Sequence, residues 1–190
     1  MEATSSSVYR WIIVPNLILG WFPLIVALIV RIWWEAKRKL NAVMLLLLAV
    51  WLLFFPNAPY VITDLVHLTY MKTKMPIHYD VIFNVFTALT SLTAGFISLY
   101  LVHEIISAKF KALGTWLLVA GLLLLCSIGV FLGRFLRWNS WDIVKQPLAI
   151  MKDSIALLEQ ADSLFFIGTF MVFLSLSYLV FYFTIQLKSN

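Results

Sequence analysis

Long apolar runs alternate with short polar stretches along this chain of 190 residues. A helix needs about 20 mainly apolar residues to cross the hydrocarbon core of a bilayer. The apolar runs therefore predict five membrane-spanning helices. We expect them at residues 11–33, 41–56, 80–102, 115–136 and 164–187.

A further apolar pattern, at residues 147–158, carries too much charge to cross a membrane. Its large apolar residues recur at intervals of three and four, at Leu148, Met151, Ile155 and Leu158. This spacing predicts an amphipathic helix lying in the membrane interface. The expected fold is all-α, a polytopic transmembrane helical bundle of five spans plus one interfacial helix. We expect residues 1–190 to form a single domain.

The composition agrees with a membrane protein. Hydrophobic residues make up 63% of the chain and charged residues 12%, whereas a soluble domain has about 25% charged residues. The mean hydropathy is +0.96. A net charge of +5 fits membrane topology and anionic lipid better than nucleic acid. We expect the lipid bilayer as the main partner, with anionic lipid or another membrane protein as further candidates.

Basic residues near the spans predict an orientation. An odd number of spans puts the termini on opposite sides, and puts the loops after the second and fourth spans on the same side. The tightest basic cluster, Lys37-Arg38-Lys39, lies in a short connection between two spans. Positive charge in such loops favours the cytoplasmic side. The N-terminus and both of these loops are therefore expected outside.

Two polar, aromatic-rich segments interrupt the apolar pattern, at residues 56–68 and 134–142. A short helix is expected from Pro59, and on it Tyr60, Asp64 and His67 would share a face. Ionisable groups beside membrane spans are costly, so they often mark a functional site. The candidate residues are Asn57, Tyr60, Asp64, His67, Asp80, Arg134, Arg137, Trp138, Asn139, Trp141 and Asp142.

The two arginines of the second segment allow two interpretations. Arg134 and Arg137 can pair with Asp64, Asp80 or Asp142 and join the two segments, because charges at a membrane boundary are usually paired. Alternatively, their guanidinium groups can bind a lipid phosphate or another anion. We expect at least one arginine–carboxylate contact between the segments.

Metal and nucleophile chemistry have weaker support. The side chains of Asp64, His67, His78, Asp80 and Asp142 are of types that bind metals, but no recognised metalloenzyme signature accompanies them. Cys126 lies in an apolar run, and Ser140 has no base beside it. The sequence assigns no catalytic residue, metal or cofactor, and leaves open whether the protein is an enzyme.

Small and polar residues also recur along one face of the third span, at Asn84, Thr87, Ser91, Gly95 and Ser98. Such a stripe serves helix packing or, less commonly, a polar pathway. Three functions follow from these patterns. The first is an outward-facing site, including Trp138 and Trp141, that binds an anionic or amphiphilic ligand such as a lipid headgroup. The alternatives are a small transporter that uses the stripe, and a partner subunit that docks through the Trp138–Trp141 loop.

Several motifs together resemble a known family. They are Phe55-Pro56-Asn57-Ala58-Pro59-Tyr60, Thr63-Asp64-Leu65, Tyr79-Asp80, Ser98-Leu99-Tyr100-Leu101 and residues 134–142. These stretches look like a bacterial membrane family, domain-of-unknown-function family 1361, and the resemblance covers nearly the whole chain. It implies a multi-pass protein of the bacterial cytoplasmic membrane. It supplies no substrate and no catalytic residue.

Overall fold

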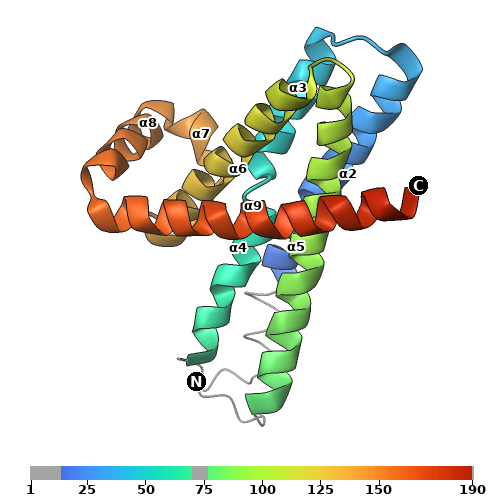
Figure 1. Cartoon of the computed structure of the whole chain (residues 1–190). Coiled ribbons are helices and arrows are strands. Elements are labelled where there is room, and N and C mark those ends of the chain that lie inside the picture. Colours follow the sequence, from blue (N-terminus) through green and yellow to red (C-terminus); the bar gives the residue numbers. More distant parts are fainter. Residues whose placement is uncertain (1–13, 70–76, 190) are drawn as a thin grey trace. The chain divides into compact units, whose positions relative to one another are not determined.

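The computed structural model describes residues 14–69 and 77–189 (Figure 1). Every regular element in these ranges is a helix. Five segments are long and apolar enough to cross a membrane: Pro15–Lys37, Ala42–Val66, His78–Ser107, Ala112–Phe135 and Ala161–Leu187. The predicted all-α fold with five spans is therefore confirmed.

The chain forms two compact units, Met1–Leu99 and Tyr100–Asn190. Helix α5, Ile77–Ser107, runs from the first unit into the second. The assignment of the whole chain to one domain stays a prediction.

The first unit contains α2 (Val14–Lys37), α3 (Ala42–Phe54), α4 (Asn57–Thr63), the 3-10 helix η2 (Asp64–Thr69) and most of α5. Helix α2 ends at Lys37, and the next residue, Arg38, has a φ of 48° in the left-handed region. Asn41 then starts α3, because its side chain accepts a hydrogen bond from the N–H of Met44 at 2.9 Å. A polar cap of this kind satisfies a backbone donor that the helix itself cannot pair.

The second span is longer than its sequence pattern predicts. We expected it to end at Pro56, but the helix resumes at Asn57 and the apolar span continues to Val66. Backbone bonding carries across the break, since Ala58 N–H donates to Phe55 and Tyr60 N–H donates to Pro56. A proline removes one backbone N–H donor, its own, so helical turns can still form on either side of it. Asn57, Tyr60 and Asp64 of the first candidate segment thus lie on the span rather than in a loop after it.

The second unit contains the end of α5, α6 (Ala112–Phe135), α7 (Asp142–Lys145), α8 (Pro147–Ala156), the 3-10 helix η3 (Leu157–Glu159) and α9 (Ala161–Ser189). Pro147 opens α8, a position where its missing N–H costs nothing. Helix α9 begins a few residues earlier than expected, so Asp162 lies in its first turn. Phe131 of α6, Leu157 of η3 and Ile167 of α9 form a buried apolar cluster that joins these elements.

Helix α8 confirms the helical pattern predicted at residues 147–158. Its Leu148, Met151 and Ile155 are 74%, 56% and 57% exposed, and therefore share an outward, apolar face. The side chain of Leu158 is outside the described residues. An apolar face left open in a membrane protein is suited to contact with lipid.

Candidate functional site

Three candidate residues of the first segment lie on the second span. Asn57 and Tyr60 belong to α4, and Asp64 begins η2. Asp64 is buried, and its Oδ2 accepts a hydrogen bond of 2.8 Å from Nδ2 of Asn16 in α2. Nδ2 of Asn57 donates to the carbonyl of Phe54 at 2.9 Å. These contacts satisfy polar groups that would be costly to leave unpaired in an apolar environment.

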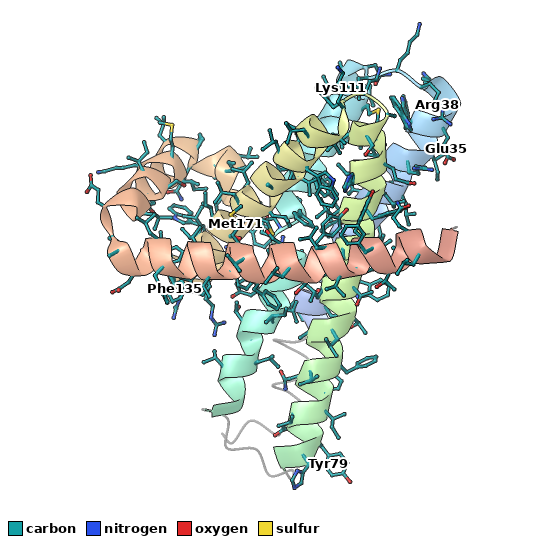
Figure 2. All side chains as sticks on the ribbon, in the orientation of Figure 1. Glu35, Arg38, Tyr79, Lys111, Phe135 and Met171 are labelled. Carbon is teal, nitrogen blue, oxygen red and sulfur yellow. The ribbon has the colours of Figure 1, made fainter. Side chains whose placement is uncertain are left out.

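Asp80 is the second buried carboxylate among the first unit's candidates. It lies in the first turn of α5, where the helix dipole stabilises negative charge. Its carbonyl oxygen accepts a hydrogen bond of 2.7 Å from Nδ2 of Asn84. The neighbouring Tyr79 is 65% exposed and points away from the helix (Figure 2). The side chain of His67 falls outside the described residues.

The polar stripe of α5 is engaged in helix packing within the first unit. Oγ of Ser91 donates to the carbonyl of Ala58 in α4 at 2.9 Å. Oγ of Ser98 accepts a hydrogen bond of 3.2 Å from Nε1 of Trp51 in α3. At Gly95 a Cβ would lie 2.8 Å from Cβ of Ala58, so the absence of a side chain permits this close approach. The contacts favour packing over a polar pathway.

The second segment turns sharply after α6. Arg134 is half-buried in the last turn, and Arg137 is exposed with a φ of 60°. A residue in this left-handed conformation commonly ends a helix. The backbone N–H of Trp138 then donates to the carbonyl of Leu132 at 3.2 Å. The turn directs Trp138 toward α8.

Side-chain hydrogen bonds fix the rest of this segment. Nε1 of Trp138 donates to Oδ2 of Asp153 in α8 at 2.8 Å. Oδ2 of Asp142 accepts from N of Asn139 at 2.9 Å and from its Nδ2 at 3.2 Å. Trp141 is 44% exposed. Trp138 therefore has a structural role toward α8, and Trp141 is the more accessible of the two.

The expected contact between the two segments joins different units, and it stays a prediction. It would link Arg134 or Arg137 to Asp64 or Asp80. Each segment has well-defined contacts within its own unit. In the part of the chain that the structure describes, no three His, Cys, Asp or Glu side chains are grouped as metal binding would require.

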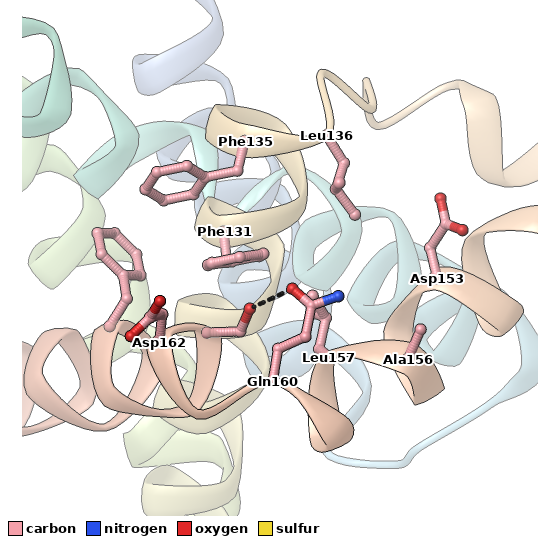
Figure 3. Close-up of a pocket in the computed structure, with 10 residues that line it drawn as sticks. Phe131, Phe135, Leu136, Asp153, Ala156, Leu157, Gln160 and Asp162 are labelled. Carbon is pink, nitrogen blue, oxygen red and sulfur yellow. Dashed lines mark hydrogen bonds between the residues drawn. The ribbon is translucent and has the colours of Figure 1, made fainter.

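A pocket of about 540 Å³ lies within the second unit, beside the second segment (Figure 3). Helix α6 contributes the rings of Phe131 and Phe135, and α9 contributes Phe166. Their centroids are 4.6 Å apart for Phe131–Phe135 and 5.0 Å apart for Phe135–Phe166. The remaining apolar lining residues are Leu136, Ala156 and Leu157. The result is a largely aromatic wall.

Polar groups complete the lining of this pocket. Asp153 comes from α8, Asp162 and Ser163 from the start of α9, and Gln160 from the connection between η3 and α9. Oγ of Ser163 donates to Oε1 of Gln160 at 3.3 Å (Figure 3). The pocket thus combines an aromatic wall with two carboxylates, Asp162 at one end and Asp153 at the other (Figure 3). Such a cavity can hold a molecule with an apolar body and a polar end.

Comparison with known protein families identifies the family of this chain. A family model described as a protein of unknown function (DUF1361) matches residues 15–176. The chain belongs to the DUF1361 family. No curated protein and no solved structure matches this DUF1361 protein.

The lining residues of the DUF1361 pocket were not among the candidates found from the sequence. Phe131 reads as an ordinary apolar residue of a span, and Phe135 lies in the second candidate segment but was not selected as a site residue. Asp153 reads as part of the charged face of an amphipathic helix. The available signal was Trp138, whose indole N–H needs an acceptor when partly buried. The acidic residue on the following helix supplies that acceptor.

A second feature missed from the sequence lies at the other end of the second unit. Nδ1 of His103 is 2.9 Å from the hydroxyl oxygen of Tyr178. The His103 ring stacks on Tyr182 at 4.9 Å and meets the edge of Trp116 at 4.8 Å. His103 is buried, and these contacts join α5, α6 and α9. We interpret this cluster as a structural joint, since its members satisfy one another.

Proposed function

We propose that this DUF1361 protein binds an amphiphile, such as a membrane lipid, in the pocket lined by α6, α8, η3 and α9. One observation carries the proposal: a cavity of about 540 Å³ combines three phenylalanine rings with a polar rim. Small-molecule sites commonly have this form, a mainly apolar cavity with a few convergent polar groups. The apolar wall suits an acyl chain, and the rim suits a headgroup.

The position of the pocket along the spans supports a lipid-like ligand. The apolar run of α6 ends at Phe135, and that of α9 begins at Ala161. Successive spans that end and begin in this way leave the membrane at the same face. The pocket includes residues from both ends, so it lies near the level where hydrocarbon meets headgroups. Following the basic cluster Lys37-Arg38-Lys39 and the family resemblance, we propose the outer face of a bacterial cytoplasmic membrane.

The pocket supports an amphiphile more directly than an anion. Arg134 and Arg137, which we expected to receive an anionic headgroup, are not among the residues that line it. The transporter alternative has less support, because Ser91 and Ser98 of the α5 stripe bond to neighbouring helices. For docking of a partner through the Trp138–Trp141 loop, Trp138 offers less support because its side chain bonds inward to Asp153, which leaves the exposed Trp141 as the accessible residue of that loop.

Native mass spectrometry of the full chain tests the proposal. The purified protein would be given a mixture of phospholipids, and the lipid retained after removal of detergent would be measured. We expect Ala156→Trp, which fills the pocket, to abolish one retained lipid. Ala161→Trp is the matched control, because Ala161 is exposed nearby and is not among the lining residues. Equal retention by the wild type and Ala156→Trp would refute the proposal.

A further inference from the structure

We propose that the ligand of this pocket carries a cationic amine in its headgroup, which the acidic lining residues, chiefly Asp153, attract into the cavity. This inference rests on the proposed function and names the headgroup chemistry. The lining residues that the structure describes include two acidic side chains and no lysine, arginine or histidine. A negatively charged cavity attracts a positive group. It repels a phosphate or sulfate, because no basic side chain lines it to neutralise the anion.

Asp153 is the more buried carboxylate of the pair. It is half-buried, and its Oδ2 is held by Nε1 of Trp138 at 2.8 Å. An indole N–H is a neutral donor, so this bond orients the carboxylate and leaves its charge intact. The orientation lowers the entropy that would be lost when a ligand binds. Trp138 is therefore a positioning residue for Asp153.

The aromatic wall adds a second attraction for a cation. Phe131, Phe135 and Phe166 form a connected cluster, with the Phe135 and Phe166 rings 5.0 Å apart and nearly perpendicular at 82°. In a perpendicular pair the edge of one ring meets the face of the other, and the faces carry negative electrostatic potential. Cations bind to such faces, more strongly where water is excluded. A cavity lined by both carboxylates and phenylalanine rings is thus a suitable environment for an alkylammonium group.

The other polar groups of the pocket are compatible with an amine donor. Oε1 of Gln160 accepts from Ser163 at 3.3 Å, and an amide oxygen has a second lone pair. Asp162 is exposed in the first turn of α9, so its charge also stabilises the helix itself. We therefore assign the larger share of headgroup selectivity to Asp153 and the smaller share to Asp162.

Binding of three probes with the same alkyl chain tests the inference. The probes are dodecylamine, dodecyl maltoside and dodecyl sulfate, each titrated against the full chain in nanodiscs. We expect dodecylamine to bind the most tightly and dodecyl sulfate the most weakly. Asp153→Asn should weaken dodecylamine binding roughly tenfold, as expected for one charge-assisted hydrogen bond, and leave dodecyl maltoside unchanged. The amide oxygen of the variant can still accept from Trp138, which preserves the fold.

Glu159 provides a matched control for Asp153. Glu159→Gln removes an exposed acidic group from the same segment that is not among the lining residues, and should change no affinity.

Phosphatidylethanolamine and phosphatidylglycerol with identical chains distinguish a lipid from a free alkylamine. If the source is a lipid, the ethanolamine lipid is preferred; if both lipids fail while dodecylamine binds, the source is a free amine.

Two outcomes separate the inference from the proposed function. If all three probes bind equally and Asp153→Asn has no effect, while Ala156→Trp still blocks binding, the amine assignment is wrong and the amphiphile pocket stands. If Ala156→Trp changes the binding of no probe, the pocket itself is wrong, and both proposals fall together.

Discussion

At the scale of single residues, two glycines determine how closely helices approach in the first unit. A Cβ on Gly20 of α2 would collide with Oγ of Ser91, and one on Gly95 would lie 2.8 Å from Cβ of Ala58. Both glycines are buried. Helices in membranes associate largely through such close packing, because lipid provides no hydrophobic drive between them. The two positions therefore control the packing of α2 and α4 against α5.

We predict that Gly20→Ala and Gly95→Ala each destabilise the protein by about 1–3 kcal/mol, the usual cost of overpacking a well-packed core. Gly121→Ala and Gly168→Ala serve as controls, because a Cβ at either position meets nothing within 4 Å. The controls should be neutral or slightly stabilising, since alanine favours a helix. Thermal unfolding in detergent measures all four variants. A fall in stability as large for the controls as for Gly20→Ala would contradict the packing argument.

Sequence reasoning reached one of these glycines and missed the other. Gly95 belongs to the small and polar stripe of α5, whose spacing alone indicates a packed face. Gly20 has no such stripe around it, and its partner Ser91 is distant in the sequence. Periodicity reports which face of a helix is special but not which helix will meet it. The same limit hid the pocket, because its walls come from four elements.

At the scale of elements, α8 has two different faces. Leu148, Met151 and Ile155 point outward, whereas Asp153 on another face bonds to Trp138 and lines the pocket. The three–four spacing of the apolar residues was sufficient to predict the helix and its apolar face, but not whether that face would meet lipid or the bundle. The role of Asp153 was not predictable, since it depends on where the turn after α6 directs Trp138.

We predict that the outward face of α8 lies in the membrane interface. Nitroxide labels at Leu148→Cys, Met151→Cys and Ile155→Cys, in a Cys126→Ala background, should collide more often with oxygen than with a water-soluble nickel complex. The reason is that oxygen concentrates in the acyl region into which apolar side chains partition. Lys152→Cys, on the charged side of the same helix, is the control and should show the reverse preference. Equal access of the nickel complex to all four labels would place α8 in water.

The second span illustrates how an element boundary can mislead. Two prolines suggested an end at Pro56, yet α4 and η2 continue the apolar span to Val66. A proline weakens a helix locally, but hydrogen bonding within the following turn restores it. Asn57 and Asp64 consequently lie on a membrane span, and Asp64 has a hydrogen-bond partner in Asn16 of another helix. Their position on the span was beyond the reach of local sequence rules.

At the scale of the whole molecule, hydropathy predicted the fold class and the number of spans. Backbone N–H and C=O groups in lipid must bond to one another, and a helix achieves this within a single apolar segment. This part of the prediction therefore needed no tertiary information. The distribution of basic residues adds an orientation. Lys37 closes α2, and Arg38 and Lys39 follow it directly, so three positive charges lie beside the end of the first span. Such a cluster resists transfer across the membrane.

We predict that the N-terminus and Lys145 face the outside, and that Lys109 and the C-terminus face the cytoplasm. Cysteines at Ser5, Lys109, Lys145 and Ser189, each in the Cys126→Ala background, would be labelled in intact cells with a membrane-impermeant maleimide. Ser5→Cys and Lys145→Cys should react from outside, and the other two only after the membrane is opened.

Each departure from this pattern has a distinct meaning. Labelling of Ser5→Cys and Ser189→Cys from the same side would contradict an odd number of spans. Reaction of Lys109→Cys and Ser189→Cys alone from outside would keep five spans and reverse the orientation. In that case the pocket at the end of α6 would face the cytoplasm, and its ligand would come from the inner leaflet. The sidedness of Lys145, in the connection between α6 and α9, therefore decides which leaflet supplies the proposed amphiphile.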